Sequence, residues 1–130
     1  MKLASIDIGL KRIGVALCLD ENIVTPQNAI LRKNRNQAAS EVDNFLNEWQ
    51  IDTLVVGLPN EGESADEMQR RIKHFVSLLN FKNKVVFMAE DFSSYEAKER
   101  MRGITKQKKD GKIDSLSAVI ILERYLMSKK

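Results

Sequence analysis

A chain of 130 residues with 43% hydrophobic and 30% charged residues has the composition of a globular protein and can bury the core of one domain. It has no apolar run of the roughly eighteen residues that cross a membrane, and its start lacks the layout of a signal peptide, so we expect a cytoplasmic protein without a membrane partner. The single cysteine, Cys18, excludes an internal disulfide, and the single histidine, His74, excludes a zinc site of several histidines.

The net charge of +3 is distributed unevenly along the chain. Residues 98–112 carry +5, so the rest of the chain carries −2. A concentrated basic segment favours a polyanionic partner, above all nucleic acid, although a solvated helix end and loop would show the same pattern. The basic residues of this segment are Lys98, Arg100, Arg102, Lys106, Lys108, Lys109 and Lys112.

The first half of the chain predicts strands at residues 2–8, 12–19 and 23–31, a helix at 34–50 and a strand at 52–57. Pro26 interrupts the third strand, which suits a position at the edge of the sheet. A turn at residues 9–11 joins the first two strands.

The second half predicts a helix from Ser64 to Asn80, with Glu67 completing a capping box, and a strand at 85–89. A helix that begins at Ser93 or Ser94, a basic loop and a final helix at 113–127 follow. This order predicts a single α/β domain over residues 1–130. Its sheet is mixed and five-stranded, with three antiparallel strands followed by parallel β-α-β crossovers, and helices cover both faces.

Asp7 places a charge inside the first apolar strand, where a buried carboxylate is costly without a partner. Metal binding is the commonest role of such a residue, and a strand end that begins a turn is the alternative. Gly9 leaves out a side chain where a phosphate could approach. Lys11 and Arg12, in the same turn, are candidates for phosphate contact or for simple solvation.

Two other acids are predicted to lie at the same edge of the sheet. Glu90 follows the last strand, and Asp114 opens the final helix, where it could instead serve as a helix cap. With Asp7 they could hold hard cations such as Mg²⁺ or Mn²⁺, which prefer oxygen ligands. Two such ions could activate water for attack on a phosphodiester.

The segments Asp7–Gly9 and Lys11–Ala16 resemble the opening motif of the YqgF/RuvX family. The resemblance continues at Val55–Pro59, at Glu90 with Ser93–Ala97, and at Lys112–Asp114 through Leu122, in the order of the family and over almost the whole chain. Members of this family are bacterial proteins with a ribonuclease H-like fold, described as pre-16S rRNA nucleases and earlier as Holliday junction resolvases.

The resemblance implies a metal-dependent nuclease whose catalytic and metal-binding acids are Asp7, Glu90 and Asp114. It also implies a mobile basic loop at about 103–112 beside the site. The chain departs from the family at Ala89–Asp91, where the family usually shows Asp-Glu-Arg. Asp91 therefore replaces a phosphate-binding arginine, and alternation along the strand favours Glu90 over Asp91 as the ligand. The acidic segment 61–67 would repel nucleic acid, so we do not expect the substrate there.

These features predict a hydrolase that processes the 5′ end of pre-16S ribosomal RNA during ribosome biogenesis, acting as a monomer or homodimer. One alternative is a resolvase that cuts branched DNA, which requires a dimer. Another is a ribosome-assembly factor that binds RNA without cutting it. The residues expected to bind nucleic acid are Lys11, Arg12, Arg102, Lys106, Lys108, Lys109 and Lys112.

Overall fold

The computed structural model describes residues 1–20, 23–60, 64–89 and 115–129 of the chain. Its strands are β1 (Leu3–Ile8), β2 (Arg12–Asp20), β3 (Ile23–Leu31), β4 (Thr53–Leu58) and β5 (Lys84–Ala89). Its helices are α1 (Arg35–Glu48), α2 (Ala65–Ser77) and α4 (Leu116–Ser128). The helix expected from Ser93 or Ser94 to Arg102 lies outside the described residues.

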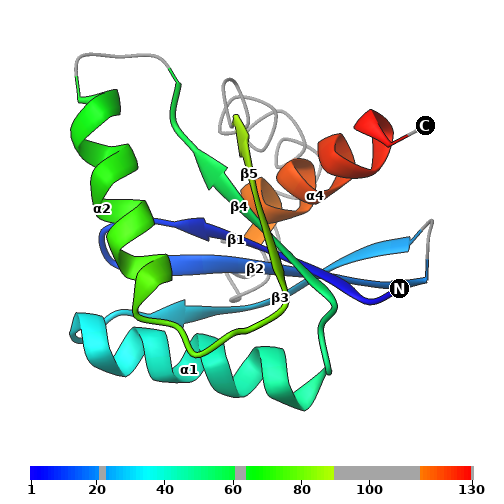
Figure 1. The fold of residues 1–130 in the computed structure, drawn as a ribbon, viewed down its shortest axis with the longest axis horizontal. Helices are drawn as coiled ribbons and strands as arrows, with labels where there is room; N and C mark the ends of the chain where they lie inside the picture. The colour runs from blue at the N-terminus through cyan, green and yellow to red at the C-terminus, as the bar shows by residue number, and fades with distance from the viewer. Residues whose placement is uncertain (21–22, 61–63, 90–114, 130) are drawn as a thin grey trace, which may run out of the picture.

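The strands form one five-stranded sheet in the order β3-β2-β1-β4-β5 (Figure 1). Strand β2 is antiparallel to both β1 and β3, whereas β4 runs parallel to both β1 and β5. The expected mixed sheet is therefore confirmed. Pro26 lies on β3, an edge strand, where its missing N–H interrupts the pairing with only one neighbour.

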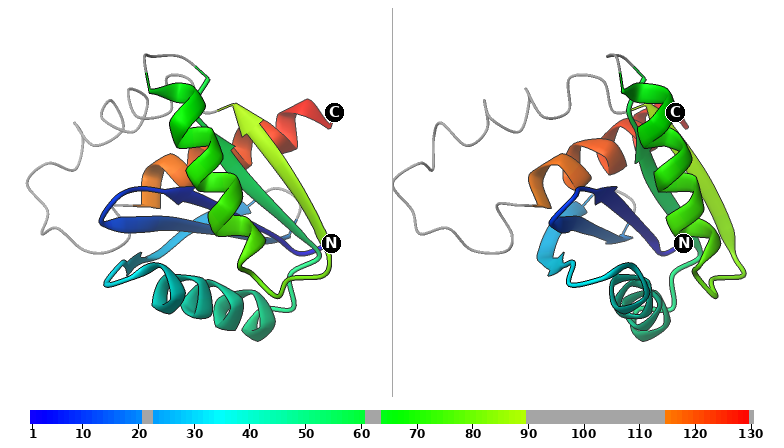
Figure 2. Two further views of the ribbon diagram at one scale, coloured as in Figure 1. Left: turned by 60° about the vertical axis from the view of Figure 1, so that its left-hand side comes forward. Right: turned by 90° about the vertical axis from the view of Figure 1, so that its left-hand side faces the viewer.

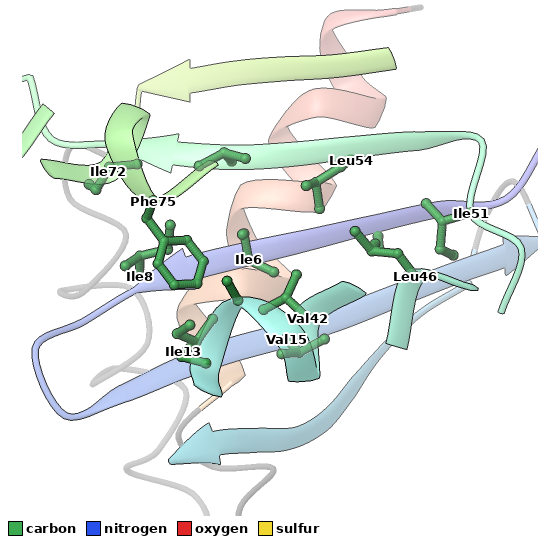
Figure 3. Packing of buried hydrophobic residues seen from close by; sticks show 14 of the residues in the cluster. Ile6, Ile8, Ile13, Val15, Val42, Leu46, Ile51, Leu54, Ile72 and Phe75 are labelled. Atoms are coloured by element: carbon green, nitrogen blue, oxygen red, sulfur yellow. The ribbon is translucent and has the colours of Figure 1, made fainter. Parts of the chain in front are cut away.

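Helices cover both faces of the sheet, as Figure 2 shows. Alternate residues of β1 point to opposite faces, since side chains alternate along a strand. Ala4, Ile6 and Ile8 pack with residues of α1 and α2, and Leu3 packs with residues of α4. The larger cluster, between the sheet and the first two helices, includes Phe75 of α2 and Leu46 of α1 (Figure 3).

The ends of two helices differ from the sequence-based expectation. Helix α1 has a capping box between Asn34 and Gln37, but it ends at Glu48, because Gln50 adopts a left-handed conformation with φ of 50°. Ser64 precedes α2 without a side-chain cap hydrogen bond, so the expected capping box with Glu67 is wrong. Its backbone (φ −99°, ψ 9°) is not extended like that of a capping residue, and Glu67 instead pairs with Arg71.

None of the helices in the described ranges is both long enough and apolar enough to cross a membrane.

Candidate functional site

Asp7 lies one residue before the carboxyl end of β1 and is partly exposed. Asp7 lies two residues after Ser5, so their side chains point to the same face of the sheet. The Ser5 hydroxyl donates to the carbonyl oxygen of Ala118 at 2.6 Å, so this is the α4 face. The residue opposite Asp7 on β2 is Gly14. On the other side, Gly57 follows Val56, the β4 partner of Ile6. Two glycines therefore flank Asp7 and leave room beside its carboxylate.

The turn after Asp7 is tight. The Gly9 N–H donates to the carbonyl oxygen of Arg12 at 2.9 Å, and a Cβ at Gly9 would stand 2.8 Å from that same oxygen. The turn's own backbone thus accounts for this glycine, where the sequence suggested the approach of a phosphate. Lys11 and Arg12 are both exposed at the turn.

Arg32 ties this turn to the rest of the fold. Its N–H donates to the carbonyl oxygen of Lys11 at 2.8 Å, and its Nη1 donates to that of Gly9 at 2.6 Å. Its guanidinium also lies 5.5 Å from the centre of the Phe75 ring, within cation–π range. The segment that carries Asp7 is therefore held by both β3 and α2.

The start of α4 is fixed beside β2 by Ser115. The pairing of β2 with β3 shifts between Ile13 and Val15, where two residues of β3, Asn28 and Ala29, lie opposite Gly14, so β3 bulges at this point. The Val15 N–H donates to Ser115 Oγ at 2.9 Å, and the Ser115 hydroxyl donates to the carbonyl oxygen of Gln27 at 2.6 Å. Ser115 is fully buried and replaces the missing ladder bond. Because Gly14 pairs with Asp7, the beginning of α4 lies one strand away from that carboxylate.

Of the three expected acids, the structure describes Asp7. Glu90 directly follows Ala89, the last residue of β5, and Asp114 directly precedes Ser115, but both lie outside the described residues. Within the described ranges no three Cys, His, Asp or Glu side chains gather as a metal site. The expected basic residues outside those ranges are Arg102, Lys106, Lys108, Lys109 and Lys112.

The donor chemistry at Asp7 fits a hard divalent cation. Its carboxylate supplies oxygen, the ligand type that Mg²⁺ and Mn²⁺ prefer, and the flanking glycines leave space for further ligands and water. Cys18, the only free thiol, is fully buried on β2, and burial raises its pKa above the ordinary value of 9.0. It is therefore a core residue and not a nucleophile.

A second feature at this end of the sheet has no counterpart in the sequence-based expectations. A pocket of about 350 Å³ lies on the face covered by α1 and α2, with Ile8, Ile72 and Phe75 among its apolar lining. Its basic lining consists of Arg32, Arg35 and Arg71. Arg32 and Arg35 flank the connection from β3 to α1, whereas Arg71 belongs to α2, so only the tertiary structure brings all three together.

Comparison with known proteins agrees with this geometry. The family described as "RuvX: Holliday junction resolvase" matches residues 1–128. A protein of Sulfurovum sp. (strain NBC37-1) named "Putative pre-16S rRNA nuclease" is 65% identical over 126 residues, covering 97% of this chain and 98% of its own. A protein of Campylobacter lari with the same name is 52% identical over 125 residues, covering 96% of this chain and 97% of its own.

Among solved structures, RuvC of T. thermophilus in complex with a Holliday junction substrate is similar with a TM-score of 0.66 at 12% identity. The match covers all of this chain and 97% of that one. This similarity confirms the expected ribonuclease H-like fold. The family match and the high identity to these relatives show that the chain belongs to the RuvX family.

Proposed function

We propose that the chain is a metal-dependent phosphodiester nuclease of the cytoplasm that processes the 5′ end of pre-16S ribosomal RNA. The observation that carries the proposal is the position of Asp7, between two glycines at the carboxyl end of β1 and one strand from the anchored start of α4. Catalytic groups of α/β proteins collect at this end of the parallel strands.

Asp114 is the second proposed ligand, because it is bonded directly to Ser115. Consecutive Cα atoms are about 3.8 Å apart, so the anchor of Ser115 at Val15 limits how far Asp114 can be from Asp7. The limit follows from the hydrogen bonds of Ser115 and the register of β1 with β2.

Glu90 is the third proposed ligand. Val86 and Met88 of β5 pack on the α4 face, the same face as Asp7. Continued alternation would direct Glu90 to that face and Asp91 to the opposite one. Strand β5 is two strands from β1 and parallel to it through β4, so its carboxyl end is at the same edge of the sheet.

A divalent cation held by these three acids would lower the pKa of a bound water and stabilise the leaving oxygen of the phosphodiester. The chain's own contribution is to fix the carboxylates on rigid elements and to position the phosphate. Lys11 and Arg12, exposed on the β1–β2 turn, and the basic segment 98–112 would bind phosphates on either side of the scissile one.

The substrate is proposed to be an rRNA precursor, because relatives at 65% and 52% identity are named for pre-16S rRNA. The description of the family and the similarity to RuvC favour a second candidate, cleavage of a four-way DNA junction. That reaction requires two symmetric incisions and hence a dimer.

The metal-dependent mechanism is tested by Asp7→Asn. We expect this variant to lose Mn²⁺- or Mg²⁺-dependent cleavage of a pre-16S rRNA substrate by at least about a hundredfold, while its melting temperature without metal stays close to that of the wild type. The matched control is Asp20→Asn, because Asp20 is an exposed carboxylate at the opposite end of β2. Full activity in Asp7→Asn would exclude the mechanism.

The substrate is tested by incubating the protein with the rRNA precursor and with a synthetic four-way junction, each with and without Mn²⁺. Cleavage of the precursor by a monomer supports rRNA processing, and paired symmetric cuts in the junction by a dimer support the resolvase. Calorimetry that finds no affinity for divalent cations, together with tight RNA binding, would instead support an assembly factor without catalysis.

A further inference from the structure

We propose that the pocket lined by Arg32, Arg35 and Arg71 binds one nucleotide unit of the substrate strand, next to the phosphate that is cut at Asp7. This inference rests on the proposed function, since it takes the substrate at the carboxyl end of β1 to be a nucleic acid. The pocket volume of about 350 Å³ lies within the range of small-molecule sites. The arginines form its basic side, and buried apolar side chains form its floor.

The three arginines come from two separate parts of the chain. Arg32 follows β3, Arg35 is the first residue of α1, and Arg71 belongs to α2. The bond from Arg32 to the carbonyl oxygen of Gly9 uses one of five guanidinium donors. Planar guanidinium groups bind phosphate oxygens in pairs, so an arginine cluster is suited to a phosphodiester.

Among the described residues, one carboxylate is paired with an arginine of this cluster. Glu67 pairs with Arg71 at 2.7 Å, and both side chains are more than half exposed. An exposed pair one helical turn apart contributes little and is screened by salt. The described lining of the pocket therefore keeps a net positive charge, despite the acidic first turn of α2 at Asp66 and Glu67.

The position of Arg35 at the start of α1 is electrostatically unfavourable for the helix. The first turn of α1 contains no acidic residue, and a cation there is repelled by the positive end of the helix dipole. Among the described residues, Arg35 has no hydrogen-bond or ion-pair partner for its exposed side chain. The same helix end favours a bound anion, so a phosphate in the pocket would relieve this repulsion.

The floor of the pocket suits the sugar or base of a nucleotide. Ile8, Ile72 and Phe75 lie close together at the carboxyl end of β1 (Figure 3). Arg32 lies over the Phe75 ring, at the border between the apolar floor and the basic side. A simple anion would use only the arginines, whereas a nucleotide would use both parts.

The pocket and Asp7 lie on opposite sides of the same strand end. Ile8 directly follows Asp7, so their side chains leave β1 on opposite faces. A substrate strand that crosses the turn at Gly9 and Leu10 would place one phosphate on the arginines and another beside Asp7. The pocket would then determine which phosphate is cut.

The test measures binding of a fluorescent single-stranded RNA oligonucleotide in EDTA, so that neither cleavage nor a metal contributes. We expect Arg35→Gln to weaken binding about tenfold and to reduce the slope of log affinity against log salt by roughly one. The control is Lys33→Gln, which removes the same charge from an exposed neighbour outside the pocket. Arg35→Gln should melt at the same or a higher temperature, since it removes a cation from the start of α1.

Equal binding by Arg35→Gln and Lys33→Gln would overturn the inference, even if the protein is a nuclease. If the wild type binds RNA through Arg35 but cuts no nucleic acid, RNA binding at the pocket is supported and the proposed nuclease activity is contradicted. The floor is tested with adenosine 5′-monophosphate and inorganic phosphate, titrated against the protein by NMR. We expect tighter binding of the nucleotide, with shifts at Ile8 and Ile72, and equal affinities would contradict a nucleotide site.

Discussion

At Gly9 the chain has no room for a side chain, because a Cβ would stand 2.8 Å from the carbonyl oxygen of Arg12. We expect Gly9→Ala to lower the free energy of unfolding by about 1–3 kcal/mol, since the backbone of the turn must move. The turn also holds Asp7 in place, so cleavage should fall by more than the decrease in folded protein explains. Urea unfolding and activity assays on the same samples measure both effects.

The control for this variant is Leu10→Ala in the same turn. Leu10 is 73% exposed, so its truncation should change stability by less than about 0.5 kcal/mol. If Gly9→Ala were as stable as Leu10→Ala, the close approach to Arg12 would not explain the glycine.

Because of Cys18, we expect the free energy of unfolding to depend on pH. Burial raises the pKa of its thiol above 9.0, because desolvation disfavours the thiolate. Below pH 9.0 the folded and unfolded states both keep the proton, so stability is unaffected. Above it the unfolded state ionises first, and the free energy of unfolding should fall as the pH rises. Reaction of Cys18 with a disulfide reagent should be much slower in the native state than in urea, and equal rates would contradict its burial.

Single residues differ in how far the sequence could reveal their roles. Asp7 is recognisable because burying a charge within an apolar strand is unfavourable unless a partner or a bound ion compensates it. The left-handed conformation of Gln50 is not recognisable, because a residue other than glycine gives no sequence signal for it. The pocket arginines each look like ordinary surface residues, and only the packing of α1 and α2 beside the β1–β2 turn brings them together.

Among the elements, helix α4 begins at a buried hydroxyl that joins it to β2 and β3. Ser115 accepts from the Val15 N–H and donates to the Gln27 carbonyl oxygen. We expect Ser115→Ala to lower the free energy of unfolding by about 2–4 kcal/mol, because the buried Val15 N–H and the partly buried Gln27 carbonyl group lose their partner. Cleavage should also decline in the folded fraction, since residue 114 would lose its anchor beside Asp7.

The matched control is Ser117→Ala, two residues further along α4. Ser117 is partly exposed, and no described residue accepts or donates a hydrogen bond to its side chain. Its substitution by alanine should leave stability nearly unchanged or slightly higher, because alanine favours the helix. A small effect of Ser115→Ala on both stability and cleavage would show that the Ser115 bridge at the β3 bulge does not position α4.

The elements were predictable to different degrees for physical reasons. Apolar periodicity reveals the strands of a half-buried sheet and the helices that cover it, and their order determines the topology. Periodicity does not reveal the β3 bulge opposite Gly14, and the serine that bridges it is 100 residues away from Val15. Apolar periodicity also does not determine where a helix ends, since α2 ends at Ser77 although apolar residues continue to Leu79.

On the scale of the whole molecule, the parallel strands give the sheet two unlike ends. The carboxyl end carries Asp7, the exposed turn with Lys11 and Arg12, and the arginine pocket. The amino end has a larger pocket of about 510 Å³, which mixes charges of both signs at Lys2, Asp52 and Lys82. The basic segment 98–112 joins β5 to α4 in sequence, between the two proposed ligands Glu90 and Asp114.

This arrangement leads to an expectation about salt dependence. Removing one ion pair between a lysine and an RNA phosphate should lower the slope of log affinity against log salt by about 0.7–0.9. Replacing Lys106, Lys108 and Lys109 by glutamine should therefore reduce the slope for RNA binding by roughly two, without changing the melting temperature. Binding is measured without divalent cations over a series of salt concentrations.

The control replaces three exposed lysines at the amino end, Lys2, Lys82 and Lys84, by glutamine. Both triple variants have the same net charge, so a general decrease in attraction would affect them equally. A lower slope in the first variant alone would mean that these lysines contact the RNA directly. Equal slopes would mean that RNA affinity depends only on the net charge of the protein. The segment 98–112 would then not be part of the binding surface.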